Sequence, residues 1–597
     1  VIEGFIDGPN DTGHNDFKWL NALMAISEGP THGFVSDSVK INNLELGKYP
    51  GADYWTRNGT HNQSPITNFA KIARHYAMQS TVKLEANSAY TYKCYNDSDY
   101  AIVTIMLPSL FRTIENEGAE DYGDMVKNYV TMRVDRSLDG VNWTLGGEFA
   151  IGGKTKSTVE FDKRINFPAE GEWYIRVTRI TGDFDGDQFK SGDTFLKSVT
   201  EYQHGRLRYP LVALFGVRLQ STNKLSGAMP TITVEARGRI LSDIRTGAQT
   251  LTSAANCANI IEDIVEHKRY GLKQDAAIDI ASFQEFAAWC DETVYYTEKD
   301  KRGVATSKNE RRYQINVVLD TPHKAPDLID KLVSTCRGIA YWYGDKLKIA
   351  IDRPVNLPND YGQMFSMGNI IKDSYKEDYI GAPDIPNQIV AYFLDEENDY
   401  EKTPIIAIDK SRLDEPVNSR TLNLYGLTTR SRAKREAIFA LKKAKAIRKF
   451  ITFEAPASAI VCEPGDVIPF SHDIPQYGYS GTILDAGLSQ YTLSRNVSLV
   501  QGQQYALRIM KQNGDYAYHT WTAPTTEVTN VVDVGSIDLA VTYDNTFAFG
   551  PIDKEVKPFR ILTVVRSDKT RFKITAEEYN SSVYIEDGTI EIVEQNY

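Results

Sequence analysis

The hydrophobic and polar positions along the chain follow two different periods, and the period changes near residue 250. Before that point apolar and polar residues alternate in short runs, as in Tyr174–Arg179 and Ile232–Arg237. Because successive side chains of a strand point to opposite faces, this alternation predicts half-buried antiparallel strands. We therefore expect a β region over residues 1 to about 250.

One stretch inside this region has strand and turn signals of its own. Its turns include Ser137-Leu138-Asp139-Gly140. Short strands separated by such turns are typical of a sandwich. The pattern predicts a β-sandwich at 90–199, inserted into an N-terminal β domain formed by 1–89 and 200–250.

Between 251 and 356 apolar residues recur instead at helical spacing. Three runs show it, at 257–265, 283–290 and 328–336. Ser282 is the predicted cap of the second run, and Gly271 is the predicted stop signal after the first. Arg312–Leu319 and Lys346–Ile351 resemble strands, so we predict a central α+β domain over 251–356.

A fourth helix is predicted over 429–449. Nine basic residues lie between Arg430 and Lys449, against the single acid Glu436. Such a helix could bind phosphate or an anionic surface. Because small and apolar residues such as Ala433 and Leu441 give it a packing side, we favour a solvated basic face on a core helix.

After this helix the pattern returns to strands. Asn513-Gly514 between Tyr505–Met510 and Tyr516–Trp521 predicts a type I′ hairpin. Phe559–Arg566 and Arg571–Ala576 flank another turn. We assign 357–470 plus 551–597 to a second β domain containing the helix, and 471–550 to a small inserted β domain. The chain is thus expected to be mainly β and multi-domain, α+β overall.

Composition and charge narrow the function classes. The 597 residues include 67 basic and 79 acidic side chains, which gives a formal net charge of −12. A negative net charge disfavours binding to nucleic acid or an anionic membrane over a large surface. Neither a membrane-spanning apolar run nor a signal peptide is visible. The five cysteines are far apart and odd in number, so we expect small buried hydrophobes rather than disulfides or a zinc site.

Motifs for catalysis or cofactor binding fail on spacing. Gly147–Thr155 resembles a phosphate loop, but Glu148 stands where its first glycine is needed. The nine histidines form no HExxH pair, and Gly478–Gly481 is not a GxSxG elbow. Asp183–Asp187 carries three alternating carboxylates but lacks the EF-hand arrangement, so an acidic turn is favoured over a Ca²⁺ site. No catalytic, cofactor-binding or metal-binding residue is assigned, and no cofactor is expected.

Short segments in a fixed order carry a resemblance to a known family. In the first part these are Ala25–Pro30, Gly33–Val35, Thr56–Thr60 with Gln63, Tyr209-Pro210, Ala213-Leu214, Gly216-Val217 and Arg237–Ile240. In the remainder they are His267–Leu272, Cys290-Asp291, Asp352–Pro354, Tyr425-Gly426, Thr429–Ala433, Pro464–Ile468, Phe559-Arg560, Ile574–Ala576 and Glu586-Asp587. Together they resemble the host specificity protein J family of siphophage tail-tip attachment proteins, typified by phage lambda.

The resemblance implies phage baseplate hub-like β domains and a virion protein at the distal end of the tail. It implies a homotrimer that closes the tail tube, connects the tail to host-recognition elements and opens for DNA passage. The implied partners are distal tail and tail-tip ring proteins, the tape measure protein and, indirectly or through a downstream region, a host receptor, without sequence-specific binding of nucleic acid. Family members usually continue into fibronectin-like domains and a receptor-binding end, whereas this sequence ends at Tyr597.

Two alternatives to a structural hub stay open. One is a hub that also degrades cell-wall peptide or glycan, with the 90–199 insertion as the place to look. The other is a host-receptor adhesin. We expect no enzymatic activity, because no matched cluster of His, Asp or Cys is visible.

The negative net charge also bears on DNA passage. A channel wall rich in Lys and Arg would hold the genome through phosphate contacts, so we expect an inner wall that is not basic overall. The basic residues of 429–449 are then expected to serve packing and subunit contacts. Charge reversal at Lys442, Lys443 and Lys445 is expected to disturb assembly more than DNA delivery.

Overall fold

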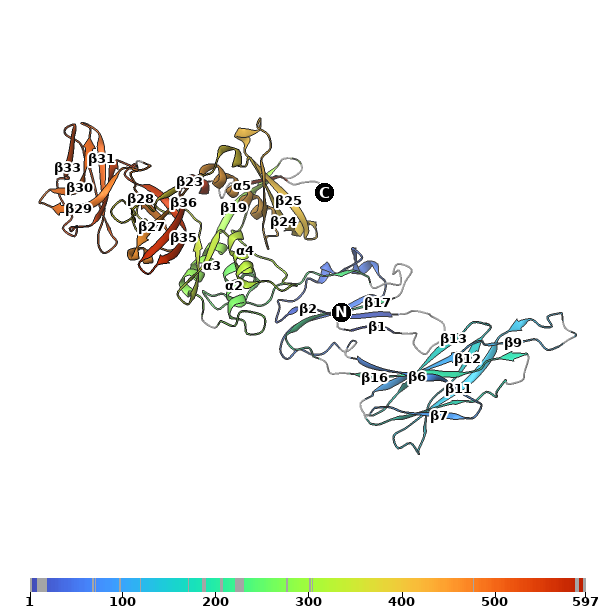
Figure 1. The fold of residues 1–597 in the computed structure, drawn as a ribbon. Coiled ribbons are helices and arrows are strands. Elements are labelled where there is room, and N and C mark those ends of the chain that lie inside the picture. Colours follow the sequence, from blue (N-terminus) through green and yellow to red (C-terminus); the bar gives the residue numbers. More distant parts are fainter. Residues whose placement is uncertain are drawn as a thin grey trace. The chain divides into compact units, whose positions relative to one another are not determined.

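The chain divides into two units, Val1–Ile240 and Leu241–Tyr597, and both are built mainly from antiparallel strands (Figure 1). The structure, a computed structural model, describes residues 3–7, 19–66, 69, 71–95, 98–116, 118, 120–169, 171–184, 189–204, 208–220, 230–274, 277–299, 302, 304–475, 477–585 and 590–593. The predicted mainly β class is confirmed.

The first unit contains a four-stranded antiparallel sheet whose order is β1 (Glu3–Asp7), β2 (Trp19–Glu28), β17 (Val212–Gln220) and β5 (Asp53–Asn58). Apolar side chains cover both faces of it. Phe215 and Val217 belong to one cluster, and Leu214 packs with Phe69 in another. β17 is therefore a buried central strand, which explains why its sequence is a nearly continuous apolar run.

Two short segments that carry the family resemblance meet beside this sheet. The backbone of Gly29 passes so close to Gly59 that a Cβ on Gly59 would lie 2.7 Å from the Gly29 Cα. Gly59 also has a φ of +76°, which side chains other than glycine's rarely allow. Both glycines are therefore required by this crossing.

Gln63 joins this backbone crossing to a third segment through hydrogen bonds. Its Oε1 accepts a hydrogen bond from the Gly59 N–H at 2.9 Å, while its Nε2 lies 2.6 Å from the Tyr209 carbonyl oxygen and 3.0 Å from that of Val212. The side chain is buried. One amide group thus satisfies backbone groups from two segments about 150 residues apart.

A two-sheet sandwich occupies the middle of the first unit. One sheet has the order β12-β11-β14-β7, and the other has the order β13-β8-β16-β6. The strands are β6 (Lys71–Lys83), β7 (Ala89–Lys93), β8 (Tyr100–Leu107), β11 (Asn128–Ser137), β12 (Thr144–Gly153), β13 (Val159–Asn166), β14 (Tyr174–Arg179) and β16 (Phe195–His204). Val103, Ile105, Met132 and Val134 lie in one apolar cluster between the sheets. The sandwich strands run from Lys71 to His204, a wider range than the 90–199 expected.

The strand predictions in the first unit have mixed outcomes. Tyr174–Arg179 is confirmed as β14, with alternate residues buried. Ile232–Arg237 is largely wrong, because only Ile232–Thr233 (β18) forms a strand. Its partner β3 (Lys40–Ile41) is equally short, and further along only isolated bridges such as Phe34 with Ala236 continue the pairing.

The helices of the second unit lie where the period changes. They are α1 (Leu251–Ala254), α2 (Cys257–Glu266), α3 (Ile280–Asp291), α4 (Ala325–Thr335) and α5 (Arg430–Ala446). The three predicted apolar runs are confirmed as α2, α3 and α4. The predicted cap Ser282 is wrong, since Asp279 caps α3 by accepting a hydrogen bond from the Ser282 N–H.

The helices share one apolar core with β22 (Lys346–Ile351) and β24 (Gln388–Asp395). Cys257, Cys290 and Cys336 belong to this core, and Cys94 and Cys462 are buried elsewhere. The prediction that the cysteines are buried is confirmed. Burial raises the pKa of the Cys336 thiol well above its usual value, which keeps it uncharged.

The second unit also holds a series of small sheets. The hairpin of β21 (Gly338–Tyr343) with β22 confirms the predicted strand Lys346–Ile351. Arg312–Leu319 is wrong as a strand. Its backbone N–H groups bond instead to scattered acceptors, such as the carbonyls of Glu292 and Cys290, because it threads between helix ends and loops. The strand lies just before it, at β20 (Ala305–Arg311), which pairs with β19 (Thr293–Lys299).

The second unit also contains two larger sheets. A five-stranded sheet has the order β23 (Lys376–Tyr379), β27 (Lys449–Pro456), β36 (Arg571–Glu578), β35 (Lys557–Asp568) and β28 (Val467–Phe470), and β35–β36 confirms the predicted second turn. A six-stranded sheet is formed by β29 (Tyr479–Ala486), β30 (Gln490–Leu499), β31 (Gln504–Met510), β32 (Tyr516–Thr522), β33 (Glu527–Asp533) and β34 (Thr546–Pro551).

The predicted hairpin at Asn513-Gly514 is confirmed, but its turn type is wrong. A type I′ turn needs a positive φ at both central residues, and here only Gly514 has one. The Gly514 N–H bonds the Lys511 carbonyl, and the Lys511 N–H bonds the Asp515 carbonyl. The loop is thus one turn followed by a glycine in the left-handed region.

Replacement of Gln63 by alanine should destabilise the first unit by about 2 kcal/mol or more, because it leaves buried backbone groups without partners. Calorimetry of the purified chain would measure the fall in the melting temperature. Asn62→Ala is the matched control, since Asn62 is exposed and adjacent. Equal melting temperatures for the two variants would contradict the role given to Gln63.

Candidate functional site

The basic helix α5 lies against the sheet formed by β24, β25 (Glu401–Ile408) and β26 (Ser419–Asn423) (Figure 1). Among the described residues, at least six of the nine basic residues between Arg430 and Lys449 form ion pairs with acids from other elements. The pairs include Arg430–Asp395, Arg430–Glu397, Arg432–Glu310, Arg435–Glu310, Lys443–Asp352, Lys443–Glu577, Lys445–Asp409 and Lys449–Glu377. The predicted solvated basic face is therefore wrong, because acids distant in sequence converge on the helix.

The first half of α5 pairs with the edge strand β20. Arg435, whose side chain is fully buried, donates to Glu310 at 2.6 Å, and Ser431 donates to the other carboxylate oxygen at 2.7 Å. Arg432 lies 3.6 Å from the same carboxylate. Glu310 thereby neutralises charge that burial alone would make costly.

The only acid of the helix, Glu436, holds a second buried cluster. It accepts two hydrogen bonds from the Arg337 guanidinium, each at 3.0 Å, and one from the Tyr313 hydroxyl at 2.8 Å. The Arg337 guanidinium also lies 3.6 Å from the centre of the Phe439 ring. Burial raises the pKa of Tyr313 well above its usual value, so this hydroxyl stays a donor.

The second half of α5 binds residues that lie far apart in the sequence of the second unit. Lys443 lies 2.9 Å from Asp352 and 2.8 Å from Glu577. Asp352 also accepts from Arg560 and, at 2.5 Å, from the Tyr584 hydroxyl. Asp352 and Arg560 both belong to segments that carry the family resemblance, and the structure brings them into direct contact. Charge reversal at Lys443 would thus act on the fold itself.

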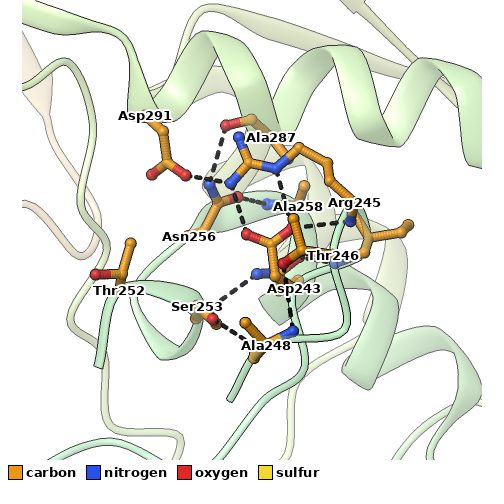
Figure 2. Close-up of polar contacts among 12 residues, drawn as sticks. Asp243, Arg245, Thr246, Ala248, Thr252, Ser253, Asn256, Ala258, Ala287 and Asp291 are labelled. Atoms are coloured by element: carbon orange, nitrogen blue, oxygen red, sulfur yellow. Dashed lines mark hydrogen bonds and ion pairs between the residues drawn. The ribbon is translucent and has the colours of Figure 1, made fainter. Parts of the chain in front are cut away.

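A polar cluster fixes the segment that leads into α1 and α2 (Figure 2). Arg245 donates to both carboxylate oxygens of Asp243, at 3.0 and 2.6 Å, and also to Asp291 at the end of α3. The Arg245 guanidinium lowers the pKa of Asp243 below its usual value. Ser253 donates to the Ala248 carbonyl at 2.7 Å, so the segment is held at both ends.

A cavity of about 440 Å³ lies beside this cluster, lined by Ser242, Asp243, Ile244, Arg245, Gly247, Glu262, Glu266, Ile278, Ile280 and Lys346. Burial, with the neighbouring carboxylates of Glu266, Asp263 and Asp243, raises the pKa of Glu262 to about 7. Sequence reasoning missed this cavity and the Arg245 cluster. Asp243 and Arg245 lie in an irregular segment without periodicity, so no local signal marks them.

The segments tested for catalytic motifs have structural roles where the structure describes them. Gly147–Gly153 lies within strand β12, which cannot wrap a phosphate. Asp183 accepts a hydrogen bond from the Ala86 N–H, but Asp185–Asp187 lie outside the described residues, as do Glu586-Asp587. Within the described ranges, no group of three His, Cys, Asp or Glu residues could hold a metal ion. Nor does any helix in them reach the length and apolarity that a membrane crossing needs.

Comparisons with known proteins find similarity to phage tail proteins over most of the chain. A family model for the FNIII-A domain of tip attachment protein J matches residues 77–205, and one for a phage tail protein matches residues 324–483. Tip attachment protein J of Escherichia phage SECphi27 is 24% identical over 601 residues, which cover 95% of this chain and 48% of that protein. The protein of the same name from Escherichia phage SECphi4 is 26% identical over 366 residues, covering 56% of this chain and 30% of its own.

A solved structure of a native gene transfer agent virion contains a chain with a TM-score of 0.36 and 10% identity, covering 64% of this chain and 66% of that one. So low a score establishes nothing about function. The chain spans about half the length of the first of its curated relatives and less of the second.

These matches define the class: the chain is a structural protein of the phage tail tip. More particularly, it is similar to the lambda-like host specificity protein J family, that of tip attachment protein J, as the sequence motifs implied. Its place is the tail tip of the virion.

Loss of Glu436 should destabilise the second unit strongly. Glu436→Gln leaves the buried Arg337 charge without a partner. We therefore expect the free energy of unfolding to fall by about 3 to 5 kcal/mol. Replacing both residues with methionine should cost less than the single change, because no buried charge then remains. Melting temperatures from calorimetry test this order, and a double variant less stable than Glu436→Gln would contradict it.

Low pH should also destabilise the second unit, because it protonates Asp352. Burial alone would raise the pKa of Asp352, but Lys443, Arg560 and the Tyr584 hydroxyl outweigh it and lower that pKa below the usual value. A lowered folded-state pKa gives stability that is present above about pH 4 and lost as the pH falls further. The melting temperature should fall less between pH 5 and pH 3 in Asp352→Asn than in the wild type. Equal falls would exclude this role.

Proposed function

We propose that the chain is the central hub portion of the tail tip: it closes the distal tail tube, connects the tail to host-recognition elements and opens for DNA passage. The alignment with a tip attachment protein J over 95% of this chain is the observation that carries the proposal. A hub built from hub-like β domains must stay rigid while the channel opens. The ion pairs that α5 makes with five segments of the second unit would supply such rigidity.

The hub is proposed to be a homotrimer, since three copies can close a ring around the tail axis through a heterologous interface. Some strands end their sheets and could pair with a neighbour along one edge, among them β5 and β25. The proposed partners are the distal tail and tail-tip ring proteins, the tape measure protein and, indirectly or through a downstream region, a host receptor. Sequence-specific binding of nucleic acid is not part of the proposal.

The proposed hub has no enzymatic activity. The alternatives are a hub that also degrades the cell wall and a host-receptor adhesin. Arg133 and Arg176 of the sandwich share the carboxylate of Asp135, so these charged groups pair with one another within the sheet. That arrangement supports a structural role for the region where an enzyme would otherwise be sought.

One preparation tests these proposals together. Light scattering on the purified chain should give a mass of three times 67.2 kDa. A stable monomer or dimer in isolated hubs and in intact tails would overturn the trimer. Host cell walls and nucleotides incubated with the same sample should yield no product, whereas turnover abolished by one carboxylate or histidine substitution would establish the enzymatic alternative. Saturable binding of the sample to intact host cells would favour the adhesin.

A further inference from the structure

Three acids crowd the end of helix α2. Glu262, Asp263 and Glu266 lie within its last five residues, and no basic residue lies in its last turn. The C-terminal end of a helix carries the negative end of its dipole, where anions are unfavourable. Glu262 and Glu266 are also one turn apart, so their charges repel each other. The charges of the helix itself therefore destabilise this end, before any contact with the rest of the fold is considered.

The 242–249 segment is bonded to the first turn of α2, and it lines the same cavity as the acids at the other end of this helix. The Ile244 N–H donates to Asn259 of α2 at 3.1 Å, and Gln284 of α3 donates to the Ile244 carbonyl at 3.1 Å. Asp243 faces the cavity as well, and its pKa is lowered by Arg245, so it adds a permanent negative charge. The segment thus brings a fourth carboxylate toward the three on α2.

Glu262 is the acid in this group that has no partner among the described residues. Its side chain is half-buried and forms no hydrogen bond or ion pair there. The charged groups around it are Asp263 and Glu266 on α2, Asp243 and Arg245 on the segment, and Lys346 on β22, while Ile278 and Ile280 form an apolar wall. Arg245 is already held by Asp243 and Asp291.

We propose that Glu262 is a proton-operated latch: its neutral form lets the 242–249 segment close on the end of α2, and its ionisation loosens both. The inference does not rest on the proposed function. It concerns the segment that directly follows the first unit, and it assigns the cavity a role in controlling how firmly that segment is held.

The latch works near neutrality. Burial and the adjacent carboxylates raise the pKa of Glu262 to about 7 in the closed form. A carboxyl with a raised pKa binds its proton more tightly when closed than when open. The closed form is therefore favoured below about pH 7 and weakened as the pH rises through that value. One proton can change the opening equilibrium by at most about tenfold per pH unit.

Hydrogen exchange of the full chain between pH 6 and pH 8, corrected for intrinsic rates, tests the latch. Amides of residues 243–247 and of the α2 end, such as Leu272, whose N–H bonds the Ile264 carbonyl, should lose protection severalfold as the pH rises. Glu262→Gln should abolish that dependence and stay protected at pH 8. Strand β17 of the same sample should be unchanged and reports that the chain is folded.

Two further variants make the result decisive. Glu285→Gln removes an exposed acid of α3 that pairs with Arg353, and it should keep the wild-type dependence. Glu266→Gln removes the like charge one turn from Glu262 and should move the midpoint to lower pH. Wild-type exchange without pH dependence, an unchanged dependence in Glu262→Gln, or an unmoved midpoint in Glu266→Gln would each overturn the proposal.

Discussion

The second unit depends on the neutralisation of one helix. α5 brings a run of cations into a largely buried position, and every acid that pairs with them comes from another element. Removing such charges from water costs several kcal/mol per ion unless each finds a partner. The helix can be buried only if β20, β24 and β36 are already in place around it. The same requirement fixes the mutual arrangement of these strands.

Two ion pairs of the second unit that lie outside α5 also have an aromatic ring beside the cation. Lys449 pairs with Glu377 and lies 4.8 Å from the Tyr477 ring centre. Arg508 pairs with Glu555 and lies 4.6 Å from the Tyr518 ring centre. A ring face attracts a cation and excludes water at once, so each ion pair is strengthened and confined to one geometry. Ion pairs of this kind contribute specificity even where an apolar replacement would give equal stability.

Sequence periodicity predicted helices and strands, which depend on neighbouring residues. It missed the ion pairs, which join residues that are far apart in the sequence. α2 and α4 were predictable because their buried faces repeat every three to four residues, and the strands β14 and β22 because their pattern has period two. The charges of α5 were misread, because Glu310 lies 125 residues from Arg435 and Asp352 lies 91 residues from Lys443, and neither acid carries a local sign of that pairing. The Arg245 cluster escaped because Asp243 and Arg245 lie in an irregular segment, where no periodicity marks them. Strand predictions failed where a segment, such as Arg312–Leu319, is extended but bonds to loops and helix ends.

The residues that carry the family resemblance explain why short motifs identified this chain. Gly29 and Gly59 cross, Gln63 binds the backbone at Tyr209, and Asp352 pairs with Arg560. In each case one motif contacts another that is far away in sequence. A glycine at a backbone crossing and a buried carboxylate opposite an arginine tolerate few replacements, whereas exposed positions between them tolerate many. The motifs therefore describe the internal frame of the protein, and host-specific properties must depend on surfaces that these motifs do not describe.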